Sequence, residues 1–239
     1  MRALTCEAGM LDDLMPASLD SGPYTESDDR FMEDVSNCVM QDTLPVLIGR
    51  RVLLREPRED DAVRLYEFVR DPEVTRFLAI DPPASPDDTR FFIEKCHEHR
   101  RQDREYVFVI ADVATDQSMG VIGLRHLDPP MRTAQVGTWV ARSYWGRGIN
   151  AEAKELLLDF AFGTLGLHRI EARIDVDNHR SRRAFERLGG RREGRLRESF
   201  FKNGGYHDQD LFVVLEEEWQ NRAGLEPGTG RRAGKGEHR

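Results

Sequence analysis

The stretch AQVGTWVARSYWGRGINAEAKELLL, from Ala134 to Leu158, decides the fold of this chain. Its first part, to Val140, is rich in β-branched and aromatic residues and predicts a strand. A turn containing Gly146 and Gly148 follows. After the turn, apolar residues recur with the spacing of one buried helical face; these are Ala153, Leu156, Leu157, Phe160 and Ala161. The stretch therefore predicts a strand, a glycine turn and a helix.

The predicted turn suits an anion such as a pyrophosphate. The first turn of a helix has backbone N–H groups without a partner in the helix, and the helix dipole favours negative charge there. Gly146 and Gly148 have no Cβ, so a phosphate can approach the main chain closely. A plain strand-to-helix turn that needs glycine for its dihedrals is an equally good interpretation of two glycines alone.

Other phosphate-binding loops match this turn poorly. A P-loop ends in Gly-Lys-Ser/Thr, whereas the sequence here is Gly148-Ile149-Asn150. A dinucleotide fingerprint needs a third glycine, and Ala151 occupies that position.

The composition favours a protein with one sizeable core. The chain has 239 residues, of which 39% are hydrophobic and 33% charged, which fits one domain better than several. No apolar run is long enough to span a membrane, and the first residues lack the apolar stretch of a signal peptide. We therefore expect a soluble, cytoplasmic protein.

The net charge of −8 is concentrated at the N-terminus. Residues 1–45 contain ten acidic and two basic residues, so the remainder is balanced. We expect an acidic, disordered or loosely docked extension over 1–42, a domain over 43–220 and a polar tail over 221–239. The charge does not indicate a nucleic-acid partner.

The cysteines indicate neither disulfides nor a metal. Cys6, Cys38 and Cys96 are widely scattered and odd in number. Cys96, His97 and His99 are close in sequence, but side chains at these spacings on a helix do not all converge on one point. We expect no metal.

The order of predicted elements favours an α+β fold. We expect one mixed, mainly antiparallel sheet with helices on both faces, and a single parallel crossover from Ala134 to Val176. Ser85, followed by Pro86 and two aspartates, is a strong helix start. The expected strands are 47–55, 106–111, 119–127, 133–140, 169–176, 191–201 and 206–215; the expected helices begin near 60, 85, 149 and 179, with a short piece over 73–78.

Three segments resemble the GNAT superfamily of acyl-CoA-dependent N-acyltransferases. They are WGRGINAEA (Trp145–Ala153), LGLHRIEARIDVDNHRSRR (Leu165–Arg183) and RLGGRREGRLRESFFKNGGYHDQDLF (Arg187–Phe212). The resemblance is strongest to the ribosomal-protein N-terminal-alanine acetyltransferases, whose first strand and helix are similar to RRVLLREPREDDAVRLYEFVRDPEV (Arg50–Val74). It covers about residues 47–219 and implies a GNAT-like fold.

The resemblance implies that acetyl-CoA is the co-substrate. Main-chain N–H groups of Gly146 to Ala151 would hold its pyrophosphate, and its pantetheine arm would pair with the strand before the turn. A main-chain N–H near Thr138 would face the thioester oxygen and stabilise the oxyanion. The implied binding residues are Trp139, Val140, Trp145, Gly146, Arg147, Gly148, Ile149, Asn150, Ala151 and Asn178.

Some residues depart from the pattern of the family. Many members use a tyrosine to protonate the leaving thiolate, but that position here is Phe185, so the resemblance points to Ser181 instead. Asn178, three residues earlier, shares its helical face and would bind pantetheine or a water. Asn150 would either donate its amide to a phosphate or cap the helix.

The general base is less clearly indicated. Gln135 occupies a position where related proteins often have glutamate, and glutamine cannot accept a proton. The other candidates are Glu171, Asp175, His126 and Tyr206, and we predict Glu171. An α-amine with a pKa near 8 is about one-tenth neutral at pH 7, whereas a lysine amine is far less so. A weak base therefore favours a low-pKa amine.

The resemblance predicts transfer of acetyl to a protein N-terminus or to a small-molecule amine. Because Phe185 and Gln135 depart from the family pattern, a degenerate acyl-CoA-binding module is the alternative. An acidic lining beyond the thioester would favour cationic acceptors. The sequence leaves the acyl chain length and the oligomeric state open, a homodimer included.

Overall fold

The computed structural model describes residues 43–222, and most of the predicted domain therefore lies within it. The expected extension over 1–42 lies outside the described residues, as does the tail beyond Arg222. The strands are β1 (Leu47–Ile48), β2 (Val52–Arg55), β3 (Tyr106–Asp112), β4 (Ser118–Asp128), β5 (Thr133–Val140), β6 (Arg169–Asp175), β7 (Arg191–Lys202) and β8 (Gly205–Leu215). The helices are α2 (Asp61–Val69), α3 (Pro72–Thr75), α4 (Pro86–Arg101), α5 (Ile149–Gly163), α6 (His179–Arg187) and α7 (Glu216–Arg222), with a 3₁₀ turn η1 (Arg142–Tyr144).

Within residues 43–222 the strands form one eight-stranded sheet in the order β1-β2-β3-β4-β5-β6-β8-β7. Strands β5 and β6 are parallel, and the other neighbours are antiparallel. The predicted α+β fold and its single parallel crossover are therefore confirmed.

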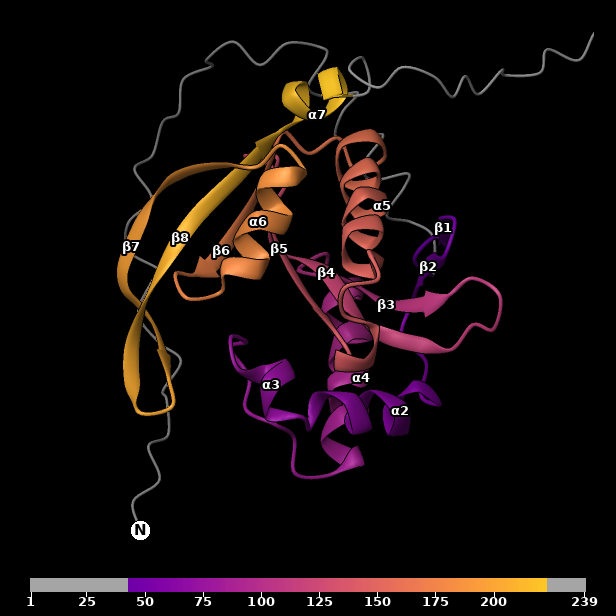
Figure 1. Ribbon diagram of the computed structural model, residues 1–239. Helices are drawn as coiled ribbons and strands as arrows, with labels where there is room; N and C mark the ends of the chain where they lie inside the picture. The colour runs from indigo at the N-terminus through magenta and orange to yellow at the C-terminus, as the bar shows by residue number, and fades with distance from the viewer. Residues whose placement is uncertain (1–42, 223–239) are drawn as a thin grey trace, which may run out of the picture.

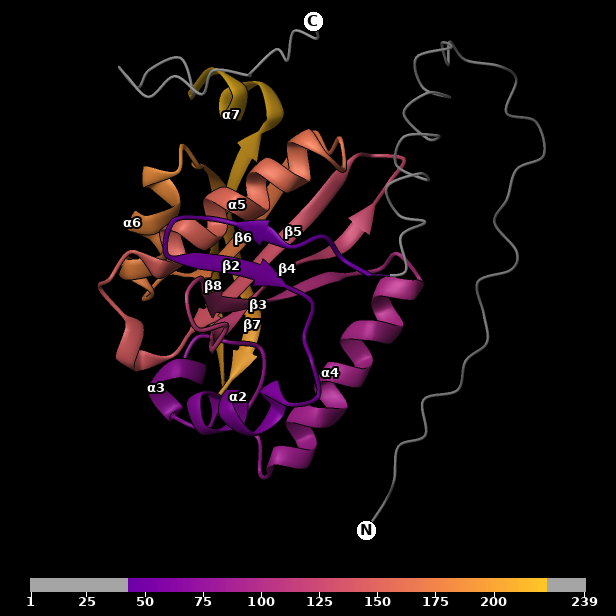
Figure 2. The ribbon, with the colours of Figure 1, turned by 90° about the vertical axis from the view of Figure 1, so that its right-hand side faces the viewer.

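Helices cover both faces of the sheet (Figures 1 and 2). On one face, Leu157 of α5 and Phe185 of α6 belong to the larger core cluster with Phe108 and Ile170. On the other face, α2 and α4 pack on the odd-numbered residues of β3, such as Val109. The alternation of strand side chains between two helical layers explains why β3 is buried along almost its whole length.

Strands β5 and β6 separate after a short parallel contact. Residues 133–135 pair with residues 169–171, and the ladder ends there. Beyond this point β5 stays paired with β4 as far as Val140, and β6 with β8 as far as Asp175. The sheet therefore opens between β5 and β6, beside the turn that leads into α5.

Two elements differ from the expected ones. The strand expected over 47–55 is a hairpin of β1 and β2, because the chain reverses at Gly49 and the Gly49 N–H donates to the Val52 carbonyl. Helix α7 lies where we predicted only the end of the domain. Its Trp219 donates to Asp159 and packs beside Phe162, so a polar segment is held as a helix by tertiary contacts.

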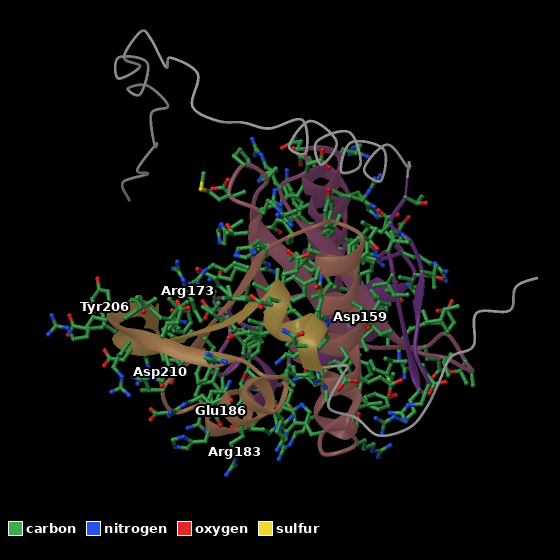
Figure 3. All side chains as sticks on the ribbon, turned by 90° about the horizontal axis from the view of Figure 1, so that it is seen from above. Asp159, Arg173, Arg183, Glu186, Tyr206 and Asp210 are labelled. Carbon is green, nitrogen blue, oxygen red and sulfur yellow. The ribbon has the colours of Figure 1, made fainter. Side chains whose placement is uncertain are left out.

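The last hairpin follows the sequence prediction. Asn203 and Gly204 both have positive φ, as a two-residue type I′ turn requires. Figure 3 shows Tyr206 at the far end of this hairpin, away from the body of the domain.

Across residues 43–222, no helix has the length and apolar character needed to cross a membrane. The same part of the chain holds no group of three His, Cys, Asp or Glu side chains arranged to bind a metal.

Candidate active site

The glycine turn connects β5 to α5 in a conformation that leaves its main chain accessible. Gly146 and Gly148 both have φ of +75°, and Gly148 is the residue that precedes the first turn of α5. A Cβ added at Gly146 would meet no atom within 4 Å, whereas at Gly148 it would lie 2.8 Å from Nη2 of Arg51. The open side at Gly146 gives an anion room to approach the backbone.

Two side-chain hydrogen bonds fix the turn to β5. Asn150 lies inside the first turn of α5, and its Oδ1 lies 3.3 Å from the hydroxyl of Thr138. The helix cap considered for Asn150 is therefore wrong, because Gly148 occupies that position. The indole N–H of Trp145 donates to the Val140 carbonyl at 2.7 Å.

A buried carboxylate supports the turn from behind. Glu152 of α5 accepts from the N–H groups of Arg50 and Arg51 and from Nε of Arg51. Burial would raise the pKa of Glu152, but these donors hold it below its ordinary value. Arg51 also donates to the Arg147 carbonyl at 2.6 Å, so the β1–β2 hairpin holds the glycine turn.

Helix α6 brings Asn178 and Ser181 to the same region. Oδ1 of Asn178 accepts from the Ser181 N–H at 3.1 Å, so Asn178 caps the first turn of α6. Arg182 pairs with the fully buried Asp210 of β8 at 3.3 Å and fixes the helix to the sheet. Phe185 is 1% exposed and packs on Phe212, so it serves the core.

The arginines near the turn have different environments. Arg180 stacks over the Trp145 ring, with Cζ 4.0 Å from the ring centroid. Arg183 is exposed on α6, as Figure 3 shows, and Arg142 lies 3.8 Å from Asp71. Arg180 is the one of these three that lines the cavity described next.

These groups line a cavity of about 730 Å³ beside the opening of the sheet. Residues of α3, the glycine turn, α5 and α6 surround it. The structure brings together here most of the residues predicted to bind acetyl-CoA and two of those predicted to be catalytic, namely Trp139, Val140, Trp145, Gly146, Gly148, Ile149, Asn150, Ala151 and Asn178 with Thr138 and Ser181. The side chain of Arg147 is not part of the lining; its carbonyl is held by Arg51 and its guanidinium lies over Tyr144.

A second cavity, of about 420 Å³, adjoins the first on the side of α2 and α4. Leu78, Thr138 and Trp139 line both cavities, so the two meet at the end of β5. The segment after α3 therefore contributes to both. Sequence reasoning identified this segment only as a short piece near 73–78 and did not assign it to the site.

The residues proposed as a general base lie outside both cavities. Glu171 stands opposite Gln135 in the short parallel ladder, and its carboxylate accepts from Nε of Arg169 at 2.9 Å. Asp175 is buried, and its Oδ2 lies 3.4 Å from Nδ1 of His207. The geometry therefore does not support Glu171 as a group that touches substrate.

Comparison with known proteins agrees with this architecture. A family profile described as "Acetyltransferase (GNAT) domain" matches residues 51–191. The chain belongs to the GNAT acetyltransferase family.

The matches to individual relatives extend over almost the whole length of those proteins. The "Putative ribosomal N-acetyltransferase YdaF" of Bacillus subtilis (strain 168) is 33% identical over 72% of this chain and 96% of its own. The "Spermidine N(1)-acetyltransferase" of Vibrio cholerae is 29% identical over 74% and 99% of the two chains. A crystal structure of spermidine N-acetyltransferase from Vibrio cholerae with CoA and spermine has a TM-score of 0.65, 25% identity and coverage of 72% and 100%.

Family membership identifies the co-substrate. This GNAT protein is an acetyl-CoA-dependent acetyltransferase, and acetyl-CoA is its co-substrate. The open main chain at Gly146, the start of α5 and the stacked Arg180 fit a pyrophosphate. Arg51 supports this site through Glu152 and the Arg147 carbonyl, and each of these partners is more than 90 residues away from it in the sequence. No local sequence signal therefore indicated the role of Arg51 or Glu152.

Proposed function

We propose that this enzyme transfers acetyl from acetyl-CoA directly to a primary amine, either a protein N-terminal α-amine or a small-molecule amine. The observation that carries the proposal is the junction of the two cavities at Thr138 and Trp139. In this proposal the larger cavity holds CoA, with its phosphates at the glycine turn. The other would bring an amine to the same point of β5, so both substrates would be held in one ternary complex.

The chain's own groups supply the chemistry in this proposal. The turn and the start of α5 hold the phosphates, and a main-chain N–H near Thr138 stabilises the oxyanion that forms at the thioester carbonyl. Ser181 donates a proton to the departing CoA thiolate, while Asn178 fixes the backbone of Ser181. In this proposal Arg147 contributes its main-chain N–H to phosphate binding, and not its side chain.

Base catalysis makes a weaker contribution in this proposal. Glu171 is engaged with Arg169 and lines neither cavity, so proton removal through it would need a relay of waters. An acceptor with a pKa near 8 has a sizeable neutral fraction at neutral pH and needs little help. This supports an α-amine or another low-pKa amine over a lysine side chain. We also expect a cytoplasmic enzyme. That it forms a homodimer stays a prediction, which a sedimentation measurement of its mass in solution would test.

The alternative is an acyl-CoA-binding module without turnover. It is favoured by the buried Phe185 at the position where many family members carry a tyrosine. A module of this kind would bind acetyl-CoA but release no CoA thiol with any amine.

Release of CoA thiol from acetyl-CoA, across a panel of peptides and small amines, tests the proposal. Ser181→Ala should lower kcat by about 100-fold, within the range of general-acid effects, and leave the KM for acetyl-CoA nearly unchanged. Ser143→Ala is the matched control, because Ser143 is exposed and lines neither cavity. Tight acetyl-CoA binding without amine-dependent release would refute the proposal, and full activity of the Ser181 variant would refute its role.

A further inference from the structure

The second cavity has a floor made by two glycines. Gly123 of β4 and Gly137 of β5 are directly paired across the strands, and both line the cavity. The next pair along the same face is Val121 with Trp139, and Trp139 packs on the core under α2 and α4. A stretch of sheet without side chains therefore lies next to the end of β5 where the two cavities meet.

Packing requires only one of these glycines. A Cβ at Gly123 would lie 2.9 Å from the Tyr106 carbonyl oxygen, so a side chain there cannot be accommodated. A Cβ at Gly137 would meet nothing within 4 Å, and its φ is not in the left-handed region. Glycine inside a strand costs roughly 0.5–1 kcal/mol relative to alanine. Because neither backbone strain nor packing requires glycine at position 137, we attribute it to space for a ligand.

The walls above this floor are mainly apolar. They come from α2, from the segment after α3, from α4 and from β3 and β4. The side chains that make the walls apolar include Leu65, Val69, Leu78, Phe92, Val107 and Val121. An apolar group placed here would be removed from water on several sides, which is favourable in proportion to the area covered.

The charged groups at the cavity are already engaged. Asp81 pairs with the buried Lys202 at 2.6 Å, and Oδ2 of Asp88 accepts from the N–H groups of Ala84 and Ser85. Arg125 lies 3.9 Å from Glu105 and adds a positive charge beside the floor. No cluster of free carboxylates lines this part of the described chain, so the lining gives a polycation little compensation for lost hydration.

From this lining, we propose that the acceptor is a primary amine carried on an apolar, preferably aromatic, body, and that Gly137 is the residue that admits this body. The inference rests on the proposed function, whose acceptor it specifies. The same chemistry occurs in a free arylalkylamine and in an N-terminal residue with a large apolar side chain. A polyamine, the substrate class named for the Vibrio cholerae relative, is disfavoured.

The test compares Gly137→Val with Gly194→Val in the full chain. Gly194 lies on β7, its added Cβ would also meet nothing within 4 Å, and it lines neither cavity. The probes are 2-phenylethylamine, a tripeptide that begins with phenylalanine, a tripeptide that begins with serine, and spermidine. Binding in the presence of CoA is measured by calorimetry, and turnover by thiol release.

Among alkylamines, we expect 2-phenylethylamine to bind and react at least about tenfold better than spermidine; among α-amines, we expect the phenylalanine peptide to do so relative to the serine peptide. Gly137→Val should reduce binding and kcat/KM for the apolar amine by about tenfold or more, with the KM for acetyl-CoA within about twofold. Gly194→Val should match the wild type. Preference for the free amine or for the peptide identifies the source of the apolar group.

Separate outcomes distinguish this inference from the proposed function. Binding of the apolar amine that depends on Gly137, without any turnover, would support the inference and refute the proposed function. Turnover with spermidine equal to or better than that with the apolar amines would refute the inference and leave the proposed function standing. Equal effects of the two valine variants on binding and kcat/KM would also refute the assignment of Gly137. So would a thermal unfolding measurement in which Gly137→Val alone fails to fold.

Discussion

Replacing Glu152 with glutamine should weaken both the fold and the binding of acetyl-CoA. The buried carboxylate accepts three hydrogen bonds, at 2.5, 2.8 and 2.8 Å, from Arg50 and Arg51. Glutamine has one acceptor oxygen, so at least one donor loses its partner and the others lose the negative charge. A hydrogen bond to a charged group contributes about 1.5–3 kcal/mol. Because the Arg51 side chain is half exposed, water will solvate it again, and we expect a loss of about 2–3 kcal/mol.

Thermal unfolding and steady-state kinetics measure this effect. For a domain of this size 1 kcal/mol corresponds to roughly 2–4 °C, so the midpoint should fall by about 4–12 °C. The KM for acetyl-CoA should rise about three- to tenfold, because Arg51 no longer holds the Arg147 carbonyl. Glu155→Gln is the control: it makes the same change on the same helix in an exposed pair with Arg222, and should cost less than about 0.5 kcal/mol.

The pH dependence gives a second check on Glu152. Its folded-state pKa is lowered, so its stabilising contribution is present above the unfolded pKa of about 4.3 and is lost as pH falls through the folded value. The difference between wild type and Glu152→Gln should therefore shrink in acid. Equal midpoints for the Glu152 and Glu155 variants at pH 7 would refute the reasoning.

Two further substitutions probe the same helix. Gly148→Ala should lower the free energy of unfolding by about 1–2 kcal/mol and raise the KM for acetyl-CoA, because φ is +75° and the new Cβ would press on Arg51. Gly163→Ala, at the other end of α5, should be neutral or slightly stabilising. Equal unfolding midpoints for the two variants would contradict this prediction. Burial lowers the pKa of Lys154 to about 8, so the unfolded chain binds more protons between pH 8 and about 10.4 and the stability of the wild type rises with pH there. At pH 7, Lys154→Met should raise the free energy of unfolding by about 1–3 kcal/mol, less the lost attraction of the ammonium to the Phe185 ring. If the difference in stability between variant and wild type does not shrink by pH 10, burial of the charge is excluded as the explanation.

Local sequence signals predicted several elements of the fold. Strand β5 has the bounds expected from its β-branched and aromatic residues, and α4 begins directly after Ser85, where the sequence indicated a helix start. The turn at Asn203 and Gly204 was equally clear, because positive φ at two successive residues restricts the choice of side chain. In these cases a few neighbouring residues carry the whole signal.

Contacts between distant residues were not predictable in the same way. The reversal at Gly49 divides an apolar run that otherwise resembles one strand, and it is held by Glu152, about a hundred residues later. The proposed base Glu171 has the right chemistry, but it accepts from Arg169 of the same strand, and only the folded chain shows that both cavities lie away from it. The apolar lining of the second cavity comes from α2, α4, the segment after α3 and strands β3, β4 and β5, so only the folded chain reveals it.

The short ladder between β5 and β6 also has a mechanical consequence. Three residue pairs join two half-sheets, one carrying Thr138 and the other leading into the helix of Ser181. The carbonyl of Arg132 accepts from the N–H groups of His168 and Arg169, just before this ladder, and so adds one more backbone contact between the two half-sheets. A small change in the angle between the two half-sheets at this ladder would give a larger displacement at the far ends of β5 and β6. The separation of Thr138 and Ser181, the two groups proposed to be catalytic, is therefore set at this ladder, whose residues line neither cavity.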